Sequence, residues 1–109
     1  MNLIENIELL LITNIEYERN PKNSILLEKR NKLKYYIILG IKGSPEKSLL
    51  LKNYLETKIF TKEKNNYLIE IYKEIEENYI NSLKDLTLNQ KRNFFEKSNR
   101  INKIKTISI

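Results

Sequence analysis

The stretch YYIILGIKGSPEK, residues 35–47, joins the most apolar run of the chain to its only two glycines and one of its two prolines. Gly40 directly follows an apolar pattern, at a position where helices often end with a left-handed residue. Ser44, Pro45 and Glu46 then match an N-cap, a first helical position and an acidic first turn. A phosphate-binding P-loop needs a glycine, four residues and then Gly-Lys-Ser/Thr, which this stretch lacks. It therefore predicts a corner between two helices.

Apolar residues before this corner recur at spacings of three and four, which is typical of amphipathic helices. Asn20-Pro21 ends the first helix, because proline disfavours helical geometry in the residue before it. Either Asn20 or Ser24 is the expected N-cap of the second. A strand over 35–41 is the competing interpretation of the aromatic and branched residues, but the apolar pattern runs in phase from Ile25 and no partner strand is evident. The predicted helices before the corner cover residues 3–18 and 23–39.

The third predicted helix begins at Pro45. Its apolar pattern lapses in the polar segment 61–66, which either starts a separate helix with Thr61 as N-cap or forms an exposed turn within one long helix. Both alternatives stay open at this point. The pattern resumes through residues 68–86. A Thr-x-x-Gln capping box at 87–90 then predicts the start of the last helix.

These patterns predict an all-α protein, a small antiparallel bundle of four to five helices in one domain, residues 1–109. The chain has no cysteine and no histidine, which excludes disulfides, thiolate metal sites and imidazole acid-base chemistry. We therefore expect no enzymatic activity, no cofactor and no metal site. The apolar start carries Glu5 and Glu8 without a basic segment, so no signal peptide is predicted. The longest apolar run, 35–39, is too short to span a bilayer, and we expect a cytoplasmic protein.

The net charge of +6 raises the question of a nucleic-acid partner. Lysine outnumbers arginine sixteen to four, and alanine and valine are absent, a composition typical of AT-rich coding sequence. Charge also alternates along the chain: residues 1–20 and 65–86 are net negative, and residues 21–64 and 87–109 are net positive. Acidic helices can therefore lie beside basic neighbours in an antiparallel bundle. The alternative is one basic face on the second and last helices, made of Lys29, Arg30, Lys34, Lys91, Arg92 and Arg100.

Aromatic residues indicate a surface for a protein partner. The chain has seven tyrosines, and two of them share the apolar stripe of residues 68–86. Phe94 and Phe95 are adjacent, so one helix cannot direct both inward, and at least one is expected to be partly exposed. Aromatic side chains beside an apolar groove are favoured at protein interfaces. The predicted partner-binding residues are Tyr72, Tyr79, Phe94, Phe95, Ile101 and Ile104.

The order of the helices and the segment NSILLEKRNKLKYYI, residues 23–37, with Leu-Leu-Glu-Lys-Arg at 26–30, resemble the small flagellar type III export chaperones of the FliT and FlgN kind. The resemblance implies a cytoplasmic all-helical protein that holds an aggregation-prone flagellar subunit in an apolar groove before export, with the last helix contributing to that groove. The expected function is thus non-enzymatic: an export chaperone or adaptor that binds an amphipathic helix of a client protein. A basic helical nucleic-acid-binding protein is the alternative, and self-association stays open.

Overall fold

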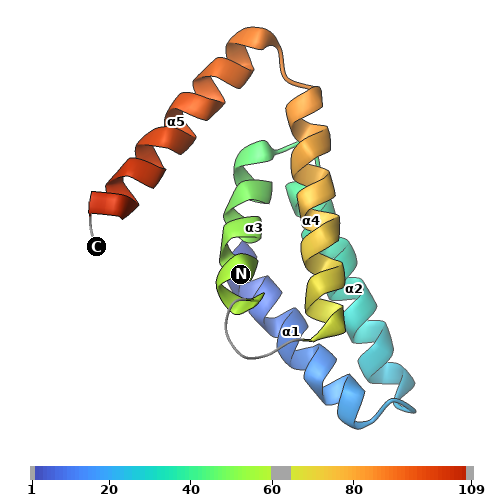
Figure 1. The fold of residues 1–109 in the computed structure, drawn as a ribbon. Helices are drawn as coiled ribbons and strands as arrows, with labels where there is room; N and C mark the ends of the chain where they lie inside the picture. Colours follow the sequence, from blue (N-terminus) through green and yellow to red (C-terminus); the bar gives the residue numbers. More distant parts are fainter. Residues whose placement is uncertain (1, 60–64, 108–109) are drawn as a thin grey trace.

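The described part of the chain forms five α-helices (Figure 1). The computed structural model describes residues 2–59 and 65–107, with the side chains of the last helix described as far as Ser98. The helices are α1 (Leu3–Arg19), α2 (Ser24–Ile41), α3 (Pro45–Ile59), α4 (Asn66–Lys84) and α5 (Leu88–Ile107). Antiparallel α1 and α2 pack against each other, as do antiparallel α3 and α4, and the two pairs meet to form a bundle.

No strand occurs in these ranges, so the predicted all-α bundle is confirmed and the competing strand over 35–41 is wrong. Within the same ranges, no helix is long and apolar enough to cross a membrane.

The corner between α2 and α3 differs in detail from its predicted form. Helix α2 continues through Gly40, and Gly43 is the glycine that takes the left-handed conformation, with a φ of 74°. The reason is packing, because Ile41 is 0% exposed and burying its side chain in the core favours one more helical residue. The predicted N-cap of α3 is confirmed, since the amide of Lys47 donates to Ser44 Oγ at 3.3 Å.

The side chain of Asn23 caps α2, one residue before the predicted candidate Ser24. Asn23 Oδ1 accepts hydrogen bonds from the amides of Ile25 and Leu26, at 3.0 and 3.2 Å. The predicted N-caps Asn20 and Ser24 are therefore wrong. The side-chain oxygen of an N-cap must reach free amides two or three residues ahead, and Asn23 is the residue that does so here.

The polar segment after α3 separates two helices. The open alternatives are thus decided in favour of separate elements, α3 and α4. Asn65 Oδ1 caps α4 by accepting from the amide of Tyr67 at 2.8 Å. The predicted N-cap Thr61 lies outside the described residues.

An apolar core lies between the helices α1 to α4. Each helix contributes side chains spaced three or four residues apart, the spacing that places them on one helix face. Burying such a side chain contributes about 1.5–3 kcal/mol to folding. The apolar side chains that are 0% exposed are Ile7, Leu10, Ile41, Leu51, Leu55 and Ile75.

Arg30 of α2 lies at the junction of three helices. Its guanidinium stacks between the rings of Tyr17 on α1 and Tyr67 on α4, 4.5 Å from each centroid. Arg30 Nη1 donates to Asn14 Oδ1 at 2.9 Å. Asn14 is 1% exposed, and its Nδ2 donates to Glu18 Oε1 at 3.1 Å. Cation–π contacts strengthen where water is excluded, so this side chain holds α1, α2 and α4 together.

We expect that the free energy of unfolding falls less at alkaline pH when Tyr67 is replaced by phenylalanine. Tyr67 is 8% exposed, and its hydroxyl has no hydrogen-bond partner in the part of the chain that the structure describes. Burial raises the pKa of Tyr67 to about 12. The folded state therefore holds the phenolic proton more tightly than the unfolded state, whose tyrosine pKa is about 10. The resulting stability is complete below about pH 10 and is lost as the pH rises toward 12.

Urea unfolding at neutral pH and at several alkaline pH values checks this expectation. Between about pH 10 and 12, the free energy of unfolding should fall more steeply for the wild type than for Tyr67→Phe. At neutral pH the variant should be at least as stable, because it removes an unpaired buried hydroxyl. Equal slopes for the two proteins would contradict the burial of this phenol.

Helix α5 leaves the bundle and points away from it (Figure 1). Its predicted capping box is confirmed: the Thr87 amide donates to Gln90 Oε1 at 2.9 Å, and the Gln90 amide donates to Thr87 Oγ1 at 3.3 Å. Among the described side chains of α5, Phe94 is the buried one, with 6% exposure, and its ring centroid lies 6.0 Å from that of Tyr79 on α4. The radius of gyration of 15.6 Å exceeds the roughly 13 Å of a compact domain of this length.

Candidate functional site

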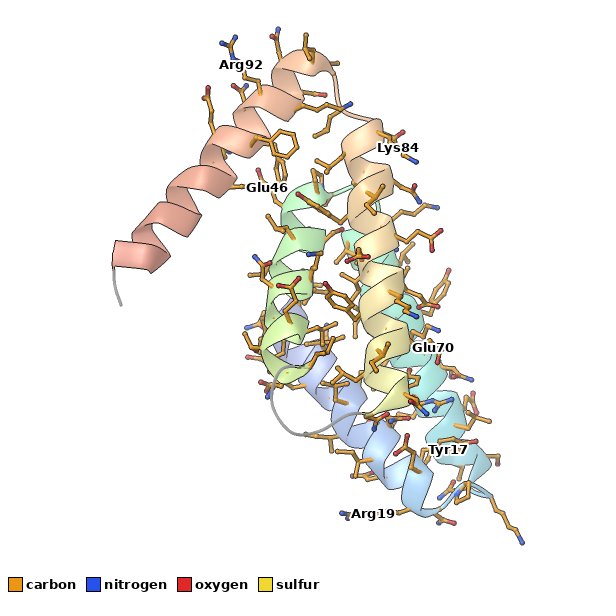
Figure 2. All side chains as sticks on the ribbon, in the orientation of Figure 1. Tyr17, Arg19, Glu46, Glu70, Lys84 and Arg92 are labelled. Atoms are coloured by element: carbon orange, nitrogen blue, oxygen red, sulfur yellow. The ribbon has the colours of Figure 1, made fainter. Side chains whose placement is uncertain are left out.

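A groove of about 510 Å³ lies between α3, α5 and the start of α1. It exists because α5 diverges from the bundle and leaves one side of α3 without a covering helix (Figure 1). Figure 2 shows Glu46 at the end of α3 that is nearest to α5. We call this feature the α3/α5 groove. Its apolar lining comes from Ile4, Leu49, Leu50, Tyr54 and Phe94, and its polar lining from Glu46, Asn53, Thr57, Lys97 and Ser98.

Three consecutive leucines explain why α3 presents an apolar surface to the groove. With 3.6 residues per turn, Leu49, Leu50 and Leu51 cannot all point in one direction. Leu51 is 0% exposed in the core, whereas Leu50 is 51% exposed at the groove. Leu49 is half-buried and also lines the groove. Helix α3 thus has two apolar sides, and the bundle covers one of them.

Tyr54 is held in place at the groove by two neighbours. Its hydroxyl donates to Glu8 of α1, and Lys58 Nζ lies 5.4 Å from its ring centroid. Burial, together with the hydrogen bond to Glu8, raises the pKa of Tyr54 to about 12. The phenol is therefore neutral at physiological pH, with its polar end occupied and its ring available as apolar surface.

The α5 wall of the groove combines an aromatic base with a charged rim. Phe95 is 46% exposed, and its ring centroid lies 5.6 Å from that of buried Phe94. The two adjacent phenylalanines thus face differently, as their spacing predicts. At the rim, Lys97 Nζ lies 3.6 Å from Glu46 Oε1, and both side chains are largely exposed. Such a pair contributes little to stability, because water competes for both charges.

Three of the six predicted partner-binding residues come together at the base of α5. Phe94 lines the groove, Tyr79 packs behind it, and Phe95 lies beside it. Ile101 and Ile104 belong to the final part of α5, where the structure describes only the backbone. Their role in partner binding stays a prediction.

Tyr72 does not line the groove, so the structure does not bring it together with Phe94. Its hydroxyl donates to Glu56 Oε1 at 2.8 Å across the contact between α3 and α4. Lys52 Nζ lies 5.8 Å from the Tyr72 ring centroid and 2.7 Å from Glu56 Oε1. Hydrogen bonds from Lys52 and Tyr72 hold the pKa of Glu56 below its usual value. Tyr72 therefore contributes to the packing of α3 against α4. Its place in the apolar stripe of residues 68–86 does not distinguish it from Tyr79, which packs against Phe94.

The residues of the predicted basic face are divided by the structure. Arg30 stacks between two tyrosines inside the helix junction. Lys34 Nζ pairs with Glu74 Oε1 at 2.9 Å. Lys29 is exposed on α2, while Lys91 and Arg92 are on α5, which points away from the bundle (Figure 1).

Figure 2 shows Arg92 directed outward from α5. The side chain of Arg100 lies outside the described part of the chain. Among the side chains that the structure describes, these cations do not form one continuous face, because α5 points away from the bundle that contains α2 (Figure 1).

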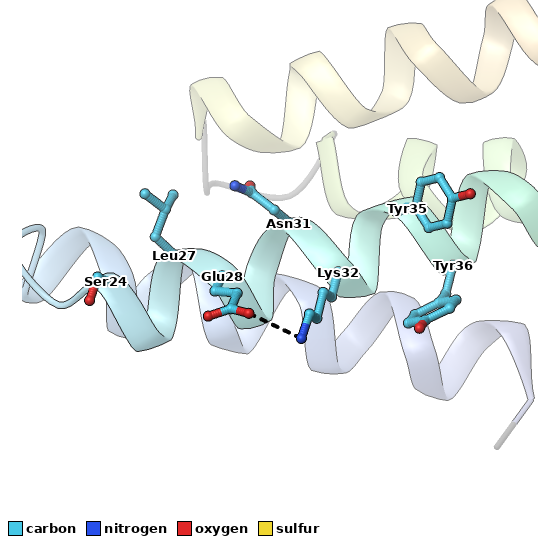
Figure 3. A pocket seen from close by; sticks show the side chains of 7 residues that line it. All are labelled: Ser24, Leu27, Glu28, Asn31, Lys32, Tyr35 and Tyr36. Atoms are coloured by element: carbon cyan, nitrogen blue, oxygen red, sulfur yellow. Dashed lines mark ion pairs between the residues drawn. The ribbon is translucent and has the colours of Figure 1, made fainter.

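A second hollow, of about 420 Å³, follows the surface of α2 (Figure 3). All of its lining residues belong to this one helix, so it is a depression between neighbouring side chains. Glu28 and Lys32 in its wall pair with each other at 3.1 Å. Tyr35 and Tyr36 are each 63% exposed, and Figure 3 shows them directed to different sides of the helix. This hollow lacks a second wall, which the α3/α5 groove has.

The groove residues of α3 were missed by reasoning from the sequence. Leu49 and Tyr54 fit the apolar pattern of a core-facing helix, and Leu50 falls outside that pattern. The available signal was the run of three leucines, which exceeds what one helix face can bury. On the opposite wall, Phe94 was predicted as a partner-binding residue and lines the groove.

The fold and the groove together define a small all-α bundle whose fifth helix diverges to form one wall of an apolar groove. Comparisons with protein-family models, curated protein sequences and solved structures found no match to this chain.

Proposed function

We propose that this protein is a non-enzymatic binding protein that holds an apolar helix of a partner protein in the α3/α5 groove. The observation that carries the proposal is Leu50, half exposed at a groove that four further apolar side chains line. Exposing apolar surface to water costs about 25 cal/mol per Å², and contiguous exposed apolar surface marks binding sites. An amphipathic helix presents side chains at i, i+3 or i+4, and i+7 to such a groove.

The geometry of α5 supports reversible holding of a client. In the described part of α5, the buried contact with the bundle is made by Phe94. A wall attached by few buried contacts moves at a low free-energy cost. In the form that the resemblance to flagellar export chaperones implies, the partner is an aggregation-prone subunit that is held before export.

The nucleic-acid alternative has less support from the geometry. Its candidate residues are on separated helices, and Arg30 and Lys34 are engaged within the bundle. A nucleic-acid complex loses affinity steeply as salt rises, because counterion release drives it. Apolar burial in a groove tolerates salt. The two functions are therefore separated by the same binding experiment.

A pull-down from native extract with three baits tests the proposed function. The baits are the wild type, Leu50→Asp, and the matched control Leu39→Asp, because Leu39 is 53% exposed on α2 and lies outside the groove. We expect a protein that the wild type and Leu39→Asp retain at high salt after nuclease treatment. Leu50→Asp should lose it, because a carboxylate in an apolar contact costs about 2 kcal/mol or more, roughly thirtyfold in affinity.

Equal retention by all three baits would contradict the groove as the binding site. Retention that disappears with nuclease or at high salt would favour the nucleic-acid function. Both positions are half exposed on helices, so circular dichroism should show that both variants remain helical, and urea unfolding should show similar losses of stability of about 1 kcal/mol.

A further inference from the structure

The two walls of the α3/α5 groove differ in charge. Helix α5 carries six lysines and arginines and a single acidic residue, Glu96. Helix α3 carries three lysines and two glutamates, and Lys52 and Glu56 among them pair with each other at 2.7 Å. A ligand in this groove therefore lies against a nearly neutral helix on one side and a basic helix on the other, and Lys97 is the cation by which that basic helix lines the groove. We call the α5 side of the groove the basic wall.

We infer that the occupant of the groove is an amphipathic helix with acidic residues along the flank that faces α5. This inference rests on the proposed function, since it specifies the partner of the same groove. The apolar side of such a helix packs on Leu49, Leu50 and Phe94, and its carboxylates meet the basic wall. Complementary charge across an interface accelerates association and disfavours partners of the wrong sign. A basic flank in the same position is repelled by α5.

Lys97 is the cation best placed to meet the partner. It lines the groove and pairs with Glu46 at 3.6 Å, with 69% and 66% of the two side chains exposed. Because an exposed pair of this kind is weak, a partner carboxylate can replace Glu46 at little cost. The ion pair with Glu46 thus holds Lys97 at the rim and leaves it able to bind a partner carboxylate.

The positive charge of α5 also disfavours a dimer in which the α5 helix of a second copy of the chain occupies the groove. A symmetric dimer brings the same surface of both subunits together. Two α5 helices side by side would place two helices of net charge +5 against each other. An acidic partner helix removes this repulsion.

Selection from a displayed library of amphipathic helices tests the inference with the full-length protein. The library keeps leucines on one face and varies each flanking position among Glu, Gln and Lys. Binders are selected on the wild type and counter-selected on Leu50→Asp, so that only groove-dependent peptides remain. We expect glutamate to be enriched about threefold or more along one flank.

A selected peptide and its Glu→Gln counterpart then provide the quantitative measurement. The Glu→Gln peptide should bind about threefold to fivefold more weakly at low salt, with the difference shrinking as salt rises. Lys97→Glu should weaken the acidic peptide by about tenfold. Lys29→Glu is the matched control, because it makes the same charge change at an exposed position on α2 and should leave binding unchanged.

The possible failures distinguish this inference from the proposed function. Groove-dependent binders without a charge preference, or with lysine enriched, would overturn the acidic flank and leave the groove function intact. If no selected peptide depends on Leu50, both proposals fail. A dimer in sedimentation that Leu50→Asp dissociates would make a second copy the occupant. Binding of homopolymeric RNA that Lys97→Glu abolishes, with no helix selected, would assign the basic wall to nucleic acid.

Discussion

Arg30→Ala is expected to lower the free energy of unfolding by about 3 kcal/mol. The guanidinium contacts the rings of Tyr17 and Tyr67 and donates to the buried Asn14. Its removal therefore deletes contacts that join α2 to both α1 and α4. Each cation–π contact contributes about 0.5–2 kcal/mol. Leaving the oxygen of Asn14 unpaired costs about 1–3 kcal/mol. The melting temperature should fall by about 10–20 °C.

Urea unfolding followed by circular dichroism measures this effect, and the neighbouring residue provides its control. Lys29→Ala removes a cation at an exposed position of the same helix and should change stability by less than about 0.5 kcal/mol. Arg30→Lys keeps the charge but loses the planar group that stacks between the rings, so it should recover only part of the loss. Equal effects of Arg30→Ala and Lys29→Ala would show that the stacked junction is absent in solution.

Ile75→Ala is expected to destabilise the protein by about 3 kcal/mol, within the range of about 2–5 kcal/mol for truncation of a buried isoleucine. Ile75 is 0% exposed in the core on α4. The cost combines lost burial with the cavity that remains, because the surrounding helices relax only in part. The midpoint of urea unfolding should shift by the corresponding amount with little change in slope.

Ile80→Ala on the same helix is the matched comparison for Ile75→Ala. Ile80 is 45% exposed. Ile80→Ala removes the same atoms as Ile75→Ala and raises helix propensity by the same amount. We expect a loss of less than about 1 kcal/mol, because a half-exposed side chain leaves no sealed cavity. A loss as large as that of Ile75→Ala would mean that this side of α4 is covered in solution.

The helices themselves were predictable from the sequence because their determinants are local. The apolar spacing through residues 68–86 identified α4, and the reciprocal bonds between Thr87 and Gln90 are formed as the capping box predicts. Partners in these interactions are three or four residues apart. Their geometry therefore depends on the helix alone and needs no knowledge of the rest of the fold.

Helix ends were harder to predict where packing competes with local preference. Gly40 is a favourable terminating residue, yet α2 continues to Ile41 because that side chain is buried in the core. Likewise, Asn23 replaces the neighbouring candidates as the N-cap of α2. In both places the local signals differ by small free energies, and a tertiary contact or a single hydrogen bond decides between them.

Local sequence patterns were sufficient to predict an all-helical protein, the starts of α3 and α5, and the apolar stripe of α4. Packing between helices decides the different surroundings of similar residues. Arg30 stacks between two tyrosines while Lys29 is exposed, and Tyr72 packs between helices while Phe95 is exposed. Packing between helices also forms the groove, whose walls come from α3 and α5, two helices that α4 separates along the chain. The shape of the groove depends on the direction of α5, which is set in part by the contact of Phe94 with Tyr79. The angle between two helices depends on how their side chains pack, and the apolar periodicity of one helix does not encode it.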